Sequence, residues 1–177
     1  MADVELAAAR ACFDVNFFAY IATTQAFLPL LLAAASQPNN RREEGYKPII
    51  ANHSSIAATS PAPWQGIYSA SKAAVVTMTD VLRFEMAPLD VAVVEIKSGV
   101  VESGIYDHGA KKVLPPHSVY EFARGPIEAA MGNYDAAEVP AEGWARDVVA
   151  GLLRRKQRRE LSYGGFAVLN GIMGSAG

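Results

Sequence analysis

The sequence has 177 residues, of which 51% are hydrophobic and 19% are charged, and its formal net charge is −2. Intrinsic disorder requires low hydrophobicity and a large net charge, so this composition predicts a folded chain, and the length favours a single domain. The slightly acidic balance argues against a nucleic-acid-binding protein, which normally carries a basic excess. Cys12 is the only cysteine and can form no internal disulfide, which fits a reducing compartment such as the cytoplasm.

Neither a metal centre nor a transmembrane segment is expected. A single cysteine gives no thiolate zinc site, and His53, His108 and His117 do not repeat at a metal-ligand spacing. The N-terminus has no basic segment followed by an apolar core, so we expect no signal peptide, and no window reaches about 20 continuous apolar residues. The apolar tail from Phe166 to Met173 is suited to packing, or to peripheral association with a membrane or a partner.

Residues 2–35 predict the first helix. Their Ala-rich beginning has high helix propensity, Asp3 is the expected N-cap, and Pro29 is expected to kink or end the ordered part. The polar stretch 36–47 contains Pro, Asn and Gly, which predicts a surface loop.

A strand, a helix and a second strand follow in that order. The apolar run 49–51 predicts a buried strand that leads into the polar cluster 52–55, and the β-branched run 91–96 predicts the next strand. Between them, residues 66–86 predict a helix that is closed by Pro88. This βαβ order implies a parallel sheet. The expected inward positions of the helix are Ala70, Ala73 or Ala74, Met78, Val81 and Leu82.

The C-terminal part is less regular. Residues 99–116 predict an irregular stretch, 119–131 and 140–155 predict helices, and 161–163 predict a last short strand. Ligands of doubly wound α/β proteins bind beyond the carboxyl ends of the strands, so we expect the functional residues directly after the first two strands.

Tyr68 and Lys72 form the first candidate site, because residues four apart lie on one face of a helix. A phenol with an ordinary pKa of about 10 is a poor base at neutral pH. An ammonium about 4 Å away, at an effective dielectric of about 20, favours the phenolate by about 4 kcal/mol. That brings the phenol into the range useful for proton transfer, whereas the pair taken alone is better explained as an ordinary exposed helix face.

Ser55 lies 13 residues before Tyr68, at the end of the first predicted strand. A hydroxyl at that edge can donate to a substrate carbonyl as negative charge develops on its oxygen. The alternative interpretation of this serine is an ordinary loop residue or a helix cap.

Four segments occur in a fixed order: FDVNFFA at 13–19, IIANHSSIAA at 49–58, YSASK at 68–72 and VVEIKSGVVES at 93–103. Together they resemble the short-chain dehydrogenase/reductase family of the classical type. That family has a Val-Asn pair on a helix, a strand ending in Asn-x-Ser-Ser, a Tyr-x-x-x-Lys helix and a Pro-Gly turn. The resemblance covers most of residues 3–105. It implies an α/β fold that is the C-terminal part of a Rossmann-like doubly wound parallel sheet.

The resemblance implies an enzyme that reduces a ketone or other carbonyl to an alcohol with NAD(P)H. Tyr68 is then the general acid that protonates the carbonyl oxygen. Lys72 lowers the pKa of Tyr68 and binds the nicotinamide ribose, and Ser55 orients the carbonyl. Asn16 holds a helix kink and the water of a proton relay, whereas its alternative role is that of a polar helix residue facing solvent or a partner.

The turn after the second strand departs from the family pattern, because Ser98 replaces the proline and Ser103 replaces the threonine. The resemblance still implies nicotinamide contacts from Gly99, Val101 and Ser103, with Tyr68 and Lys72 as further cofactor-binding residues.

Three segments, FDVNFFAYIATTQAFLPLL, WQGIYSASKAA and PAEGWARDVVAGLL, resemble the acyl-dihydroxyacetone-phosphate reductase branch of the family. That branch implies NADPH in preference to NADH, and a lipid-like or secondary-metabolite ketone as substrate. Residues 99–139 would form the substrate lid within a single domain that comprises residues 1–177.

The sequence contains no Gly-rich phosphate-binding loop of the kind that opens this family's fold. We therefore expect that the first βαβαβ half is missing, and that the edge of the first strand is open. A second hypothesis follows: a truncated, non-catalytic chain or interaction module that binds no cofactor alone. The family pairs the two long helices between subunits, so a homo-oligomer is also expected.

Overall fold

The computed structural model describes residues 2–37, 47–103, 113–131 and 138–166. Its centre is a parallel sheet with the strand order β1-β2-β3. The α/β fold and the parallel arrangement predicted from the sequence are therefore confirmed. The strands are β1 (Ile49–Ser55), β2 (Ala92–Ser98) and β3 (Glu160–Tyr163).

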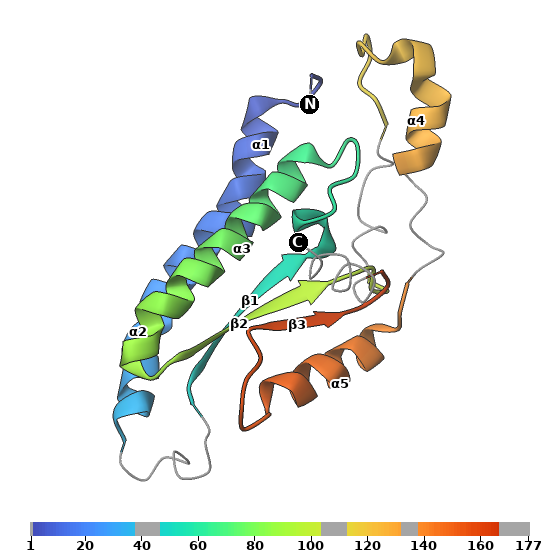
Figure 1. Ribbon diagram of the computed structural model, residues 1–177. Coiled ribbons are helices and arrows are strands. Elements are labelled where there is room, and N and C mark those ends of the chain that lie inside the picture. Colours follow the sequence, from blue (N-terminus) through green and yellow to red (C-terminus); the bar gives the residue numbers. More distant parts are fainter. Residues whose placement is uncertain (1, 38–46, 104–112, 132–137, 167–177) are drawn as a thin grey trace.

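Helices cover both faces of this sheet, as Figure 1 shows. Three helices that follow one another in the chain lie along one face, the last helix lies across the other, and a short helix stands to one side. The helices are α1 (Leu6–Phe13), α2 (Ala19–Ser36), α3 (Gly66–Met86), α4 (Arg124–Met131) and α5 (Ala141–Leu152).

The N-terminal helix differs from its prediction at its start and in its middle. It begins at Leu6, and Asp3 is not its N-cap, because the Asp3 carboxylate accepts a hydrogen bond of 2.5 Å from the Ser118 hydroxyl instead. Between α1 and α2 the backbone widens into a π-helical turn over Asp14–Phe18. Such turns often occur at functional sites, since the extra residue changes which side chains face a neighbouring element.

Pro29 does not end the helix, because α2 continues through it to Ser36. Proline removes one backbone hydrogen bond, to the carbonyl of the residue four positions earlier. That residue, Gln25, is exposed, so water can satisfy its carbonyl. On its inner side, α2 packs leucines against the core.

The predicted strand–helix–strand unit is confirmed, with α3 ending where the sequence places it. However, β1 extends through the polar residues to Ser55, four residues beyond its predicted end. Its register with β2 runs from Ile49 opposite Ala92 to Ser55 opposite Ser98. The two strands therefore present Ser55 and Ser98 side by side at their carboxyl ends.

The predicted inward face of α3 is only partly right, since Leu82 packs against the core and Ala73, Ala74 and Met78 are partly buried. Ala70 and Val81 are exposed, whereas small and polar residues point inward. Ser71, Lys72 and Thr79 face inward because they form hydrogen bonds to the π-helical turn or to β1, which hydrophobic periodicity does not reveal. The buried residues of α3 are Ser69, Ser71, Lys72, Val75, Thr79 and Met86.

The main hydrophobic core lies between the sheet and the helices α2 and α3. Around it pack Leu28, Leu31 and Leu32 of α2 and Leu82 of α3. Its buried members are Ala35, Ile50, Met86, Val91 and Val93.

On the opposite face, Val148 of α5 and Leu161 of β3 are buried. Gly151 brings α5 close to the sheet, since a Cβ there would lie 2.8 Å from Leu161 Cδ1. The predicted helix 140–155 and strand 161–163 are thus confirmed, with slightly different ends.

The central strand β2 also carries two buried charges, Glu95 and Lys97. Ser54 Oγ donates a 2.5 Å hydrogen bond to Glu95 Oε1, and Lys97 Nζ lies 2.6 Å from Glu160 Oε2 and 3.9 Å from Glu95 Oε1. Burial raises the pKa of Glu95, while the hydrogen bond from Ser54 and the charge of Lys97 oppose that rise. This network connects all three strands through Ser54, the residue before Ser55.

Only part of the predicted lid can be compared with the structure. A turn at Glu121–Ala123 and then α4 replace the predicted helix 119–131, so its regular part begins later than expected. Arg124 holds this segment together by donating to the carbonyl oxygens of Leu114 and Pro115 and to Glu128. The remainder of the region 99–139, most of the predicted loop 36–47 and most of the apolar tail lie outside the described residues.

By length and composition alone, the helical stretch Leu6–Ser36 is long and apolar enough to cross a membrane, with a mean hydropathy of 1.6 in its most apolar window. This stretch contains no unbroken run of about 20 apolar residues. None of the residues in that window is fully buried, although Leu28, Leu31 and Leu32 of α2 are partly buried against the core.

Candidate active site

Three segments meet at the carboxyl end of β1: the strand itself, the first turns of α3 and the π-helical turn. The turn that directly follows Ser55, Ile56–Ala58, packs against α3, and so does the π-helical turn. Proteins with parallel sheets bind their ligands beyond the carboxyl ends of the strands.

Tyr68 and Lys72 lie one turn apart at the start of α3, as the sequence predicts. Lys72 Nζ is 5.9 Å from the centroid of the Tyr68 ring, within the range of a cation–π contact. The Lys72 side chain is buried at 8% exposure, whereas Tyr68 is 36% exposed. Burial lowers the pKa of Lys72 from its ordinary value, because the charged form loses hydration.

Lys72 is also tied to the strand that ends in Ser55. Its Nζ donates a 3.0 Å hydrogen bond to the backbone oxygen of His53. Ser55 itself is buried, and its Oγ accepts a hydrogen bond of 3.2 Å from the Ala57 N–H. One lone pair is used in this contact, and the hydroxyl proton remains for an acceptor such as a carbonyl oxygen.

Asn16 lies in the π-helical turn and contacts α3. Its Nδ2 donates to Ser71 Oγ at 3.1 Å and lies 3.4 Å from Cys12 Sγ. Ser71 in turn donates to the Tyr68 backbone oxygen at 2.7 Å. Asn16 is therefore connected through one hydroxyl to the backbone of Tyr68.

His53 is a residue that the sequence analysis considered only as a metal ligand. Its Nε2 lies 2.6 Å from Ser98 Oγ, and its ring centroid is 5.6 Å from that of Trp144 in α5. Burial of the ring, and then the positive charge of Lys72, lower the pKa of His53. Its side chain connects β1 to β2 and α5, while its carbonyl faces Lys72.

Tyr20 was also missed, although it lies one helical turn after Asn16. Its hydroxyl donates a 2.8 Å hydrogen bond to the same His53 oxygen that Lys72 contacts, and Lys72 Nζ is 5.9 Å from the centroid of its ring. Burial raises the pKa of Tyr20, the hydrogen bond to His53 lowers it, and proximity to Tyr68 raises it further, so that the net change is upward. The i,i+4 spacing from Asn16 is the sequence signal that could have identified it.

The turn after β2 holds the predicted nicotinamide contacts and is packed against the end of β3. The Gly99 N–H donates to the Tyr163 oxygen at 2.9 Å, and the Glu102 N–H donates to the Val139 oxygen at 2.9 Å. A Cβ on Gly99 would lie only 1.8 Å from the Gly165 oxygen, so this position requires glycine for a close backbone approach.

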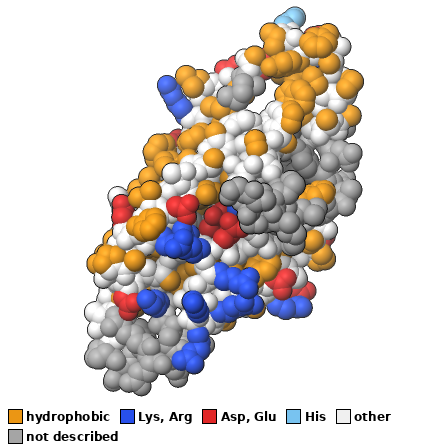
Figure 2. All heavy atoms as spheres, in the orientation of Figure 1, with side chains coloured by type: hydrophobic (Ala, Val, Ile, Leu, Met, Phe, Trp, Pro, Cys, Tyr) orange, Lys and Arg blue, Asp and Glu red, His pale blue; other side chains and the backbone are white. Residues whose placement is uncertain are grey.

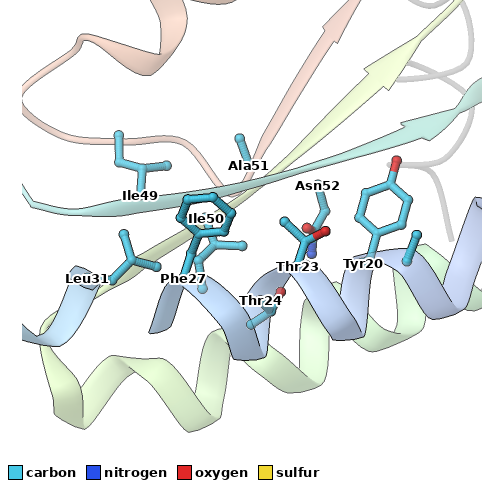
Figure 3. A pocket seen from close by; sticks show the side chains of 10 residues that line it. Tyr20, Thr23, Thr24, Phe27, Leu31, Ile49, Ile50, Ala51 and Asn52 are labelled. Carbon is cyan, nitrogen blue, oxygen red and sulfur yellow. The ribbon is translucent and has the colours of Figure 1, made fainter. Parts of the chain in front are cut away.

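An apolar groove of about 460 Å³ runs beside the site, between α2 and the free edge of β1. Figure 3 shows Leu31 and Ile49 at one end of this groove and Tyr20 and Asn52 at the other. Among the described residues β1 is an edge strand, as the sequence analysis expects.

Comparisons with known proteins identify the family of the chain. The family model of the short chain dehydrogenases matches residues 1–112. Over 160 residues the chain is 35% identical to a short-chain dehydrogenase/reductase of Pestalotiopsis microspora, covering 88% of this chain and 50% of that protein. Over 169 residues it is 31% identical to the NADPH-dependent 1-acyldihydroxyacetone phosphate reductase of Saccharomyces cerevisiae, covering 93% of this chain and 52% of that protein.

Solved structures support the fold. A short-chain dehydrogenase from Streptomyces avermitilis superposes with a TM-score of 0.71 at 22% identity, covering 99% of this chain and 60% of that one. A short chain dehydrogenase from Burkholderia cenocepacia in complex with NADP gives a TM-score of 0.63 at 23% identity, covering 97% and 58% of the two chains.

The chain thus spans about half the length of the curated relatives that it matches. The family match nevertheless covers more than half of the chain and includes every predicted catalytic residue. From its motifs, its Rossmann-like sheet and these similarities, the chain belongs to the short-chain dehydrogenase family of oxidoreductases.

Proposed function

We propose that this chain carries the catalytic residues of a reductase that converts a ketone to an alcohol with NAD(P)H. The observation that carries the proposal is the juxtaposition at the carboxyl end of β1. There Lys72 flanks the ring of Tyr68 and is hydrogen-bonded to the strand that ends in Ser55.

The chain's own residues would manage the proton and the developing charge. Tyr68 donates its hydroxyl proton to the carbonyl oxygen, and the Lys72 ammonium stabilises the phenolate that remains. Ser55 donates its hydroxyl to the same oxygen and orients the carbonyl. Asn16, through Ser71, fixes the first turn of α3 on which Tyr68 stands.

The nicotinamide cofactor would supply the hydride. An ammonium and a phenol are suitable donors for ribose hydroxyls, so Lys72 and Tyr68 fit the role of holding the nicotinamide ribose. Val101 and Ser103 are proposed as further contacts of the nicotinamide. The Gly99 N–H already donates to Tyr163, so a contact from Gly99 would use another atom.

NADPH and an apolar ketone are the favoured cofactor and substrate class. The yeast relative named above is NADPH-dependent and reduces 1-acyldihydroxyacetone phosphate, which supports both choices. The lid region 99–139 offers apolar side chains such as Val113 and Phe122, which are exposed. These would contact a lipid-like substrate.

The test follows NADPH oxidation in the presence of a panel of ketones with acyl chains of increasing length. Tyr68→Phe is expected to reduce turnover by at least about 100-fold, the usual contribution of a general acid. Tyr163→Phe, which removes a phenol from β3, serves as the control and is expected to retain activity. An active Tyr68→Phe variant would refute the proposed roles.

A non-catalytic chain is the second candidate, because the sequence has no Gly-rich loop and spans half of its relatives. Calorimetry distinguishes the two. Micromolar binding of NADPH by the 177-residue chain supports the enzyme, whereas no binding together with no turnover supports an interaction module.

A homo-oligomer located in the cytoplasm completes the proposal. Figure 2 shows hydrophobic side chains along the side of the molecule that α1, α2 and α3 form. Phe27 of α2 and Phe84 of α3 are among the exposed side chains, and Phe84 is 74% exposed. Apolar helix faces of this kind are typical of subunit interfaces, and size-exclusion chromatography with light scattering would measure the assembly.

A further inference from the structure

Two phenols, not one, flank the Lys72 ammonium. Lys72 Nζ lies 5.9 Å from the ring centroid of Tyr68 and also 5.9 Å from that of Tyr20. Tyr68 is on the same helix as Lys72, whereas Tyr20 comes from α2, across the helix interface. The ammonium is therefore within cation–π distance of two aromatic rings that come from different helices.

The two groups from different helices share one acceptor. The Tyr20 hydroxyl at 2.8 Å and Lys72 Nζ at 3.0 Å both donate to the backbone oxygen of His53, using its two lone pairs. The His53 carbonyl cannot move away easily, because its side chain is held by Ser98 and Trp144. The acceptor is thus a fixed point for both donors.

The π-helical turn and the start of α2 contact two successive residues of α3. Asn16 donates to Ser71, and one turn later Tyr20 reaches over Lys72. The π-helical turn at Asp14–Phe18 surrounds Asn16 and sets the direction in which both side chains point. Figure 3 shows Tyr20 at one end of the groove, with its ring pointing from α2 toward β1.

We infer that Tyr20 is a positioning residue: anchored on the His53 oxygen, its ring covers the Lys72 ammonium and holds it beside Tyr68. The hydrogen bond to the His53 oxygen also determines the protonation state of Tyr20. As a donor to a carbonyl, the Tyr20 hydroxyl has to keep its proton, so Tyr20 supports Lys72 without competing with Tyr68 for the role of acid. The upward change in the pKa of Tyr20 agrees with this assignment.

This inference relies on the proposed function for what Lys72 does, but the contact itself can be tested without turnover. The 177-residue chain is treated with trinitrobenzenesulfonate, and mass spectrometry follows the modification rate of each lysine. Lys97 of β2 is the internal reference, because it is buried and its ion pair is with Glu160 of β3.

Tyr20→Phe keeps the ring and removes the hydroxyl. Losing one hydrogen bond worth about 1 kcal/mol should make Lys72 react about fivefold faster, with the rate at Lys97 unchanged. Thr24→Val is the matched control, since it removes a hydroxyl from the same helix one turn later, and it should leave both rates unchanged.

An unchanged rate at Lys72, or an equal increase at both lysines, would overturn the inference, because it would show no specific contact or only general loosening. Nuclear magnetic resonance of the unaltered chain, with ¹³Cζ-labelled tyrosine, provides an independent check. A Tyr20 signal that ionises below the ordinary pKa of a phenol would contradict its role as a permanent donor. If these tests succeed and Tyr68→Phe remains active, the positioning contact stands and only the proposed reaction fails.

Discussion

A buried hydrogen bond between Asn52 and Thr79 connects the strand that carries Ser55 to the helix that carries Tyr68 and Lys72. Asn52 Nδ2 donates to Thr79 Oγ1 at 3.0 Å, and Thr79 Oγ1 donates to the Val75 oxygen at 2.7 Å. Thr79 has no exposed surface, and Asn52 is 3% exposed. Water therefore cannot replace either partner.

Replacing Thr79 by valine preserves the shape of the side chain but removes its hydroxyl. The Asn52 amide would then be buried without this acceptor, which costs about 1–3 kcal/mol. With a urea m-value of about 2 kcal/mol/M, the unfolding midpoint should fall by about 0.5–1.5 M. Thr79→Ser is the control, because it keeps the hydroxyl and loses only one methyl group, worth about 0.8 kcal/mol.

A double-mutant cycle shows whether the loss arises at Asn52. In an Asn52→Ala background the donor is already absent, so Thr79→Val should cost less than about 0.5 kcal/mol. Urea titrations followed by circular dichroism supply the four free energies of unfolding. The reasoning is refuted if Thr79→Val is as stable as the unaltered chain, or if its cost is the same in both backgrounds.

Three further predictions can be checked with the same titrations. Gly99→Ala should destabilise the chain more than Thr79→Val does, because its Cβ would lie 1.8 Å from a backbone oxygen, and an equal or higher midpoint would contradict this. His53 has a lowered pKa, so the unfolded state binds more protons from pH 6.5 down to the folded pKa. Stability should therefore fall on acidification through that window, and His53→Gln should remove this part of the fall. Glu95 has a raised pKa, so its contribution to stability is present below pH 4.5 and is lost as the pH rises through the folded pKa. Glu95→Gln should consequently gain stability relative to the unaltered chain as the pH rises, and a constant difference would argue against a buried carboxylate.

Local sequence signals were sufficient to predict β1, α3 and β2, the elements that surround the candidate site. The β-branched residues of β2 and the long helix before Pro88 predicted the parallel unit, and this order is what places Ser55 near α3. The spacing of Tyr68 and Lys72 depends only on helix geometry, which a sequence carries directly. Consequently Tyr68 and Lys72 lie one turn apart on α3 and in contact with each other, as the sequence predicts.

Elsewhere, tertiary contacts led to a structure that local sequence signals did not predict. Asp3 is a good N-cap by type, but its carboxylate is used by Ser118, more than one hundred residues away in the chain. Val81 fits an inward apolar position, yet it is exposed, because Thr79 and Lys72 are the residues that bond to β1. Hydrophobic periodicity cannot identify a helix face that is buried through polar contacts.

The same limit explains why Tyr20 and His53 were missed, and it bears on how the site works. Each is unremarkable in its local sequence, and their importance arises only when α2, β1 and α3 come together around one carbonyl oxygen. The sequence supplies the reacting groups through local spacing, whereas the groups that orient Lys72 come from distant segments. A chain that keeps Tyr68 and Lys72 but packs α2 differently would therefore retain the motif and lose the geometry that the proposed proton transfer requires.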